Sequence, residues 1–213
     1  MKKVIGRETN IIYKIQTSIT DQLYDDYIPL ENEDYILKLL SKKDNKFQNI
    51  DNMFSYLKNR KIQDLNIAKP IEKIIEDDFG YIIKIKPNMV SLHALLKSDF
   101  DIDWWKDSGG LRKRLHILCN LSQLLSELHN RGLVYGSLSP NSILISNEDK
   151  STEVFLLNVE NITHKSKIGN INLELQYSAP ELIKGISGID TYTDDYSFTQ
   201  FSHINSTKST NLS

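Results

Sequence analysis

The chain is poor in cysteine, in proline and glycine, and in long apolar runs. Its 213 residues include one cysteine, Cys119, so no disulfide can form within the chain and an oxidising compartment is not indicated. We expect Cys119 to be a buried thiol, because it lies on the apolar side of a helical pattern. Nine glycines and five prolines exclude a collagen-like chain. No run of about 18 apolar residues occurs, and no apolar segment follows the N-terminal lysines, so we expect a cytoplasmic protein.

An excess of charge of one sign is also missing. Lysine and arginine number 26, and aspartate and glutamate 28, so the net charge is −2. A chain with this balance has no global basic field to hold nucleic acid or an anionic membrane, and we expect neither as a partner. The five histidines never pair at i, i+4 around an acid, and there is no C-x-x-C, so no metal-ligand spacing is present.

The first third of the chain alternates apolar and polar residues in short runs, which is typical of a small sheet. We predict strands at residues 10–16 and 34–40, and a hairpin made by residues 70–77 and 80–86. Between the second strand and the hairpin, apolar residues at three- to four-residue steps predict an amphipathic helix over residues 47–57.

After Pro87 the pattern becomes mainly helical. We predict a short helix at residues 91–97 and a long helix at 111–131, where leucines recur at helical spacing until Gly132 ends the pattern. Two short strands are predicted at 142–146 and 153–157, separated by a polar turn.

The most specific motif is HNRGLVYGSLSPNSILIS, at residues 129–146. It resembles, without gaps, the end of the long helix and the catalytic loop of protein kinases, H-R-D-L-x-P-x-N-I-L. Its Y-G variant looks like the loop of a bacterial kinase-like family that reads Y-G-D-L-S-P-N-N-I. Four further segments resemble kinase elements in the same order: V-A-I-K at residues 35–38, the strand before D-F-G at 154–162, A-P-E at 177–182 and D-x-W-S-L at 194–198.

This resemblance implies an α+β, bilobal protein-kinase-like fold with a small β-rich N-lobe and a truncated, mainly helical C-lobe. The N-lobe would comprise residues 1–86 and the partial C-lobe residues 87–200. Residues 201–213 are mostly Ser, Thr and Asn, and we expect a disordered polar tail there.

The residues that perform the chemistry in kinases are replaced here. In that family an Asp of the loop accepts the substrate proton, while a loop Asn and the D-F-G Asp hold magnesium. The resemblance puts Ser137 at the base position, Ser142 at the Asn position and Asn158 at the D-F-G position. A neutral serine cannot accept a proton near pH 7, which removes a general-base factor of about 10²–10⁴. An amide in place of a carboxylate weakens a magnesium site, although Glu160 is an alternative ligand two residues on.

Nucleotide binding is expected to be weak. A phosphate-cradling loop needs glycines, and residues 5–10 keep only Gly6. Lys38 stands where kinases carry their phosphate-binding lysine, but the partner position falls on Asn49 or Asp51. A solvated lysine at a strand edge remains the alternative for Lys38.

An adenine slot is expected near Ile83, Lys84, Ile85 and Lys86, because such a slot is apolar and uses backbone hydrogen bonds. We therefore expect ATP to bind weakly and Mg²⁺ to contribute little.

The residues that support the loop are kept. The resemblance implies that Asp194 accepts hydrogen bonds from the loop backbone, and that Glu181 of the A-P-E element is an unpaired surface acid, because the late helix that pairs with it is missing. Only 32 residues follow Glu181. We expect an apolar face of the long helix to be exposed and to bind a protein partner or a second copy.

Retained scaffold residues and lost catalytic residues resemble a pseudokinase, a kinase fold used for binding or scaffolding. Two alternatives stay open: an active serine/threonine kinase that uses unconventional residues, and a truncated kinase fragment without function.

Overall fold

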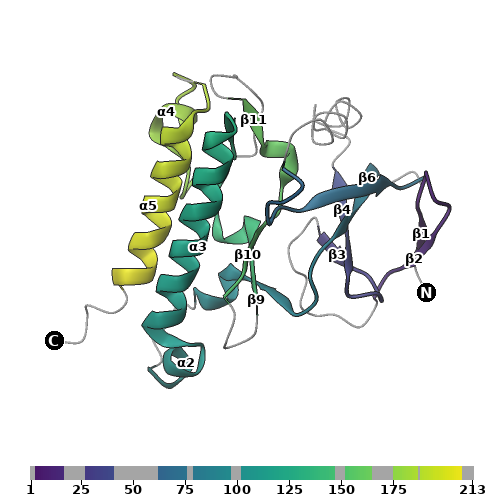
Figure 1. Ribbon diagram of the computed structural model, residues 1–213, viewed down its shortest axis with the longest axis horizontal. Coiled ribbons are helices and arrows are strands. Elements are labelled where there is room, and N and C mark those ends of the chain that lie inside the picture. Colours follow the sequence, from purple (N-terminus) through teal and green to yellow (C-terminus); the bar gives the residue numbers. More distant parts are fainter. Residues whose placement is uncertain are drawn as a thin grey trace. The chain divides into compact units, whose positions relative to one another are not determined.

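The computed structural model (Figure 1) divides the chain into two compact units. Unit 1 comprises Met1–Gln63 and Ala68–Met89, and unit 2 comprises Asp64–Ile67 and Val90–Ser213. The structure describes residues 3–16, 27–40, 62–75, 79–96, 102–146, 152–164, 175–186 and 188–207.

The described residues of unit 1 form six short antiparallel strands. They are β1 (Lys3–Ile5), β2 (Ile12–Lys14), β3 (Tyr27–Pro29), β4 (Tyr35–Leu40), β5 (Lys69–Lys73) and β6 (Phe79–Lys84). β1 and β2 form a hairpin, and the other four form a sheet in the order β3-β4-β6-β5. The predicted strand at 34–40 and the hairpin of 70–77 with 80–86 are confirmed by β4 and by the β5–β6 pair. The predicted strand at 10–16 is shorter, and the helix predicted at 47–57 lies outside the described residues.

Bridges join the β1–β2 hairpin to both edges of the four-stranded sheet. Ile15, after β2, pairs with Leu30, after β3, and Gly6, after β1, pairs with Ile74, after β5. Each of the six strands therefore has a neighbour on both sides, in the order β1-β2-β3-β4-β6-β5 and back to β1. We call this arrangement the strand ring. The apolar side chains that fill the unit come from all around this ring: Val4, Tyr13, Ile15, Leu30, Leu37, Ile74 and Ile82.

The loops and small sheets of unit 2 lie along one long helix. Its elements are β7 (Met89–Ser91), η2 (Leu92–Leu95), α2 (Ile102–Asp107), α3 (Gly110–Asn130), β8 (Leu133–Val134), η3 (Pro140–Ser142), β9 (Ile143–Ser146), β10 (Val154–Leu156), η4 (Val159–Asn161), β11 (Thr163–His164), α4 (Pro180–Ile183) and α5 (Thr191–Thr207). The strands form a three-stranded sheet, β10-β9-β7, and a β11–β8 pair. α3 and α5 run side by side (Figure 1).

The long helix α3 confirms the prediction for residues 111–131 and ends before Gly132, whose φ is +72°. Its buried face contains Ile117, Leu121, Leu124, Leu125 and Leu128. The paired strands β9 and β10 confirm the predictions at 142–146 and 153–157.

Three predictions for unit 2 need correction. Cys119 is exposed, so the prediction of a buried thiol is wrong. The residue lies two positions after buried Ile117, and two positions on a helix turn a side chain to a different face. The helix predicted at 91–97 is a single 3₁₀ turn, η2. α5 continues to Thr207, so helix extends past residue 201, where the polar tail was predicted to begin.

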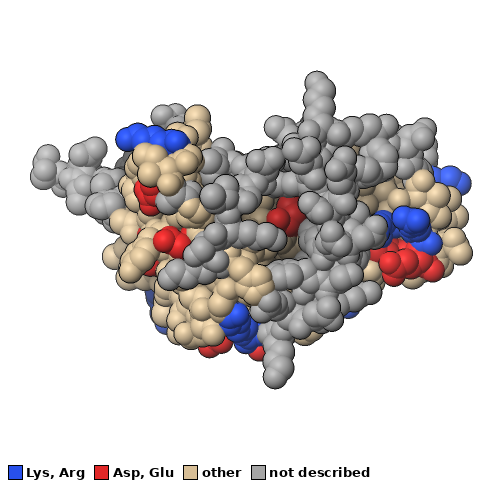
Figure 2. All heavy atoms as spheres, turned by 90° about the horizontal axis from the view of Figure 1, so that it is seen from above, with Lys and Arg blue, Asp and Glu red and all other residues tan. Residues whose placement is uncertain are grey.

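Charges of both signs are interspersed on the described surface seen in Figure 2, and neither sign gathers into one large patch there. No helix among the described residues is long and apolar enough to cross a membrane.

Gly80 in β6 gives a test of how closely the strands of unit 1 pack. A Cβ at Gly80 would lie 2.4 Å from the backbone oxygen of Lys38 in β4. We expect Gly80→Ala to lower the free energy of unfolding by about 1–3 kcal/mol, because the neighbouring strand must shift. Lys84→Ala, at the exposed last residue of the same strand, is the control and should change it by less than about 0.5 kcal/mol. Urea unfolding measures both, and equal effects would contradict the close approach.

Candidate functional site

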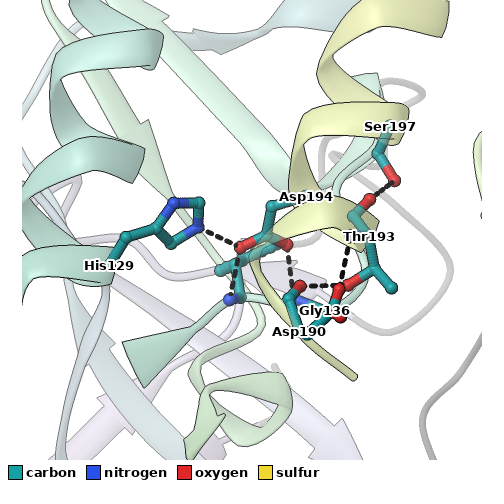
Figure 3. A network of polar contacts seen from close by, with 7 residues as sticks. His129, Gly136, Asp190, Thr193, Asp194 and Ser197 are labelled. Atoms are coloured by element: carbon teal, nitrogen blue, oxygen red, sulfur yellow. Dashed lines mark hydrogen bonds and ion pairs between the residues drawn. The ribbon is translucent and has the colours of Figure 1, made fainter. Parts of the chain in front are cut away.

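The loop of residues 135–142 is fixed to unit 2 by the carboxylate of Asp194, at the start of α5 (Figure 3). Asp194 is fully buried. Its Oδ2 accepts the backbone N–H of Tyr135 at 2.8 Å and lies 2.9 Å from Nε2 of His129, while its Oδ1 accepts the N–H of Gly136 at 2.7 Å. The hydrogen bonds expected from Asp194 to the loop backbone are therefore present.

The start of α5 is itself ordered by short polar contacts. The hydroxyl of Thr193 donates to the backbone oxygen of Asp190 at 2.6 Å, and the hydroxyl of Ser197 donates to the backbone oxygen of Thr193 at 2.9 Å (Figure 3). These bonds hold the first turn that carries Asp194, so the carboxylate meets the loop in a defined orientation.

Two residues at the start of the loop explain its path. Gly136 has φ +80°, a backbone conformation that favours glycine. Tyr135 is fully buried, and its hydroxyl donates to the backbone oxygen of Leu157 at 2.6 Å. This bond ties the loop to the residue that precedes Asn158.

Ser142, at the position of the metal-binding amide, uses its hydroxyl inside the loop. Its Oγ accepts the N–H of Ser139 at 3.0 Å and donates to the backbone oxygen of Ser139 at 2.9 Å. Ser142 is fully buried and Ser137 is 7% exposed. The side chain of Ser142 therefore closes the 3₁₀ turn η3.

A backbone hydrogen bond next to Asn158 joins that residue's segment to this turn. The N–H of Leu157 donates to the backbone oxygen of Ser142 at 2.8 Å, and Asn158 follows with φ +49° at the start of η4. The structure thus brings the backbone beside Asn158 to the loop that Asp194 anchors, which contains Ser137 and Ser142. These three side chains supply two hydroxyls and an amide, and none is a carboxylate. Glu160, in η4, is half-buried.

No group of three or more His, Cys, Asp or Glu residues that could hold a metal ion occurs in the part of the chain that the structure describes. Glu181, in α4, is half-buried and forms no ion pair with any described residue.

In unit 1, Lys38 is buried, with 5% of the residue exposed. Its strand β4 lies between β3 and β6, and its ammonium lies 4.0 Å from the ring centroid of Tyr27, the residue paired with it on β3. The alternative of a solvated lysine at a strand edge is therefore wrong. A cation over an aromatic face is attracted by the ring, so Tyr27 helps to hold the ammonium.

Gly6 lies in the turn between β1 and β2, against β5. A Cβ on Gly6 would overlap the carboxylate of Glu72, with 2.2 Å between that Cβ and Oε2. The N–H groups of Glu8 and Thr9 donate to the same carboxylate at 3.2 and 3.1 Å. This turn, which the sequence resemblance aligned with the phosphate loop of kinases, therefore directs two of its amides at a carboxylate of the chain itself.

The residues predicted to line an adenine slot alternate along the end of β6 and beyond. Ile83 and Ile85 are buried, and Lys84 and Lys86 are exposed. The N–H of Ile85 donates to the backbone oxygen of Asp34 at 2.8 Å. The slot itself stays a prediction.

Sequence reasoning missed Glu72, Tyr13 and Tyr27. Glu72 is a single acid in the segment PIEKII. The available signal was that strand alternation places this acid on the inward face. No local signal pointed to Tyr13 or Tyr27, because their partners lie far away in the sequence.

No family model and no curated protein matches the sequence. Solved structures do match in three dimensions. Vaccinia related kinase 3 superposes with a TM-score of 0.65 and 18% identity, covering 94% of this chain and 67% of that chain. A chain of the yeast RNA Pol II CTD kinase CTDK-1 complex matches with a TM-score of 0.65 and 16% identity, covering 92% and 62%.

A third similar structure is ROP2 from Toxoplasma gondii, described as a virulence factor with a protein-kinase fold and no enzymatic activity. Its TM-score is 0.65 and its identity 14%, and the match covers 92% of this chain and 64% of that chain. The chain therefore has an α+β, bilobal protein-kinase-like fold, as predicted. It spans roughly two thirds of the length of these three chains.

Replacing the anchor of the loop gives a direct test of its role. In Asp194→Asn, one oxygen becomes an NH₂ group that faces N–H donors, so we expect the free energy of unfolding to fall by about 1–3 kcal/mol. Asp195→Asn, on the exposed side of the same helical turn, should change it by less than about 0.5 kcal/mol. Denaturant unfolding of both variants measures the difference, and an unchanged Asp194→Asn protein would contradict the anchoring role.

Proposed function

We propose that this chain is a catalytically defective kinase-like domain, a pseudokinase, that acts by binding rather than by phosphoryl transfer. The observation that carries the proposal is that Ser137 and Ser142 lie in a loop whose anchor, Asp194, is intact, with the neutral Asn158 at the start of η4. Phosphoryl transfer in this fold needs a base and metal-held phosphates. A serine at the base position does not accept a proton near neutral pH, and Ser142 already uses its hydroxyl within the loop.

The proposal includes weak nucleotide binding with little dependence on magnesium. Lys38 is kept and buried in β4, so one positive group for a phosphate remains. The metal positions carry no carboxylate, and magnesium prefers carboxylate and phosphate oxygens. The amides of the Gly6 turn are used by Glu72. ATP would then be held mainly through its base, at the predicted slot of residues 83–86.

A binding role also needs a surface, and unit 2 offers one on its helices. Leu111 and Leu115, one turn apart on α3, are 52% and 53% exposed, and Ile102 of α2 is 42% exposed. We propose that a protein partner or a second copy of the chain covers this surface, which we call the leucine face. Apolar groups gathered on a surface are typical of interaction sites.

The second candidate function is an active serine/threonine kinase that uses unconventional residues. Glu160 favours it, because this acid lies two residues after Asn158 in the same 3₁₀ turn. A non-functional fragment is the third candidate. We further propose a cytoplasmic location, since the one thiol of the chain, Cys119, is exposed and unpaired by any disulfide.

The catalytic proposal predicts no magnesium- or manganese-dependent phosphotransfer from labelled ATP to itself or to generic protein substrates. Three of the groups that act together in phosphoryl transfer are replaced. Losing all three leaves only the positioning of the substrates to promote the reaction. The double variant Ser137→Asp, Asn158→Asp should gain activity if those positions are what the chain lacks. Turnover by the unaltered chain that Lys38→Met abolishes would support the second candidate and contradict the proposal.

The nucleotide proposal predicts a small thermal shift. A ligand present at its Kd adds about 0.4 kcal/mol of stability, which for a chain of this size is roughly 1 °C. We expect a shift of that order or less with millimolar ATP, nearly equal with and without Mg²⁺. A shift of many degrees that requires Mg²⁺ would contradict the proposal.

The surface proposal predicts that the isolated chain self-associates or binds a hydrophobic dye. Leu111→Gln with Leu115→Gln should weaken both effects, because each change removes exposed apolar area. Arg112→Gln with His116→Gln has the same spacing one residue further along α3, and both residues are exposed. Light scattering and dye fluorescence compare the two pairs, and equal effects would show that the leucine face is not the site.

A further inference from the structure

The carboxylate of Glu72 is buried inside unit 1 and surrounded by donors. Glu72 is fully buried and lies on β5, at an irregularity in the β5–β6 register that follows Pro70. Its Oε2 accepts the N–H groups of Glu8 and Thr9. The hydroxyl of Thr9 lies 2.8 Å from Oε1 and 3.0 Å from Oε2, and the hydroxyl of Tyr13 donates to Oε1 at 2.5 Å.

All four donors come from one short stretch of sequence, residues 8–13, that lies 59 to 64 positions away from Glu72. Two are backbone amides of consecutive residues and two are hydroxyls. Consecutive amides that converge on one point form a concave anion site in proteins. The turn is closed by its own backbone bonds, from the N–H of Gly6 to the oxygen of Ile11 and from the N–H of Asn10 to the oxygen of Gly6.

The pKa shifts of Glu72 and Tyr13 favour a charged acceptor and a neutral donor. Burial alone would raise the pKa of Glu72, but the hydrogen bonds from Tyr13, Thr9 and the two amides together bring that pKa below its ordinary value. Burial raises the pKa of Tyr13, and the hydrogen bond and negative charge of Glu72 raise it further. Glu72 is therefore a carboxylate and Tyr13 a neutral donor over the physiological pH range.

The carboxyl group of Glu72 packs directly against Gly6, because a Cβ at Gly6 would overlap it. The hairpin that carries the donors is joined to β5 by a few backbone bonds, from the N–H of Arg7 to the oxygen of Lys73 and from the N–H of Ile75 to the oxygen of Ile5. The carboxylate thus stands where the β1–β2 hairpin meets the edge of the sheet.

We propose that residues 8–13 form a site for a small carboxylate, that its ligand is the side chain of Glu72, and that this internal ligand fastens the β1–β2 hairpin to β5 and closes the strand ring. The site binds small carboxylates as a class, and not only the side chain of Glu72 that the chain itself supplies. Shortening Glu72 to alanine removes none of the four donors and opens space for a free formate or acetate ion. The inference is independent of whether the chain binds nucleotide.

The test is rescue of Glu72→Ala by formate or acetate. We expect this variant to have a lower melting temperature than the unaltered chain and faster hydrogen exchange at the amides of Glu8 and Thr9. Added formate or acetate should raise its melting temperature and slow that exchange, whereas chloride at the same ionic strength should not. Glu33→Ala, which removes an exposed acid from the same unit, is the matched control and should respond to all three salts as the unaltered chain does.

Rescue confined to Glu72→Ala supports the site. Equal responses of Glu72→Ala, Glu33→Ala and the unaltered chain would mean a general salt effect and would overturn the proposal, as would the absence of any response in a folded Glu72→Ala protein.

A second measurement covers the case in which Glu72→Ala does not fold. Tyr13→Phe and Thr9→Val each remove one donor and keep the size of the side chain. We expect exchange at the Glu8 and Thr9 amides to speed up about tenfold or more, which corresponds to the loss of a hydrogen bond to a charged group. Unchanged exchange in both variants would show that the hairpin is held without the carboxylate.

Discussion

A single buried carboxylate, that of Asp194, organises the centre of unit 2. A charge without water is costly unless donors surround it, and Asp194 has two loop amides and the ring of His129. His129 is near the end of α3, the amides begin the loop, and Asp194 itself starts α5. The requirement to satisfy one charge therefore sets the positions of three segments. Ser137, Ser142 and Asn158 lie where they do because this arrangement holds the loop.

The same physical solution occurs in unit 1. Glu72 is buried there with two amides and two hydroxyls as donors, and it joins the β1–β2 hairpin to the sheet. In both units backbone amides of a turn donate to one carboxylate that lies far away in the sequence. The buried carboxylates of Asp194 and Glu72 therefore both serve the fold.

The residues that hold this fold differ from those on which the proposed loss of catalysis rests. The protein-kinase-like fold needs the apolar face of α3, the turn chemistry of the loop and the anchor at Asp194. The proposed loss of the reaction rests instead on Ser137, Ser142 and Asn158. A likeness of fold at 14–18% identity is therefore compatible with the loss of the reaction.

Local sequence patterns were enough to predict strand β4, the β5–β6 hairpin and helix α3 up to Gly132, and they showed the neutral residues of the loop. Periodicity and residue spacing predict these elements because each depends on residues that are close in the sequence. The position of the Lys38 ammonium beside the Tyr27 ring and the carboxylate in the Gly6 turn became evident only from the folded structure. Those outcomes depend on partners from other segments, and in the last case on hydrogen bonds across 59 to 64 residues that no short-range pattern encodes.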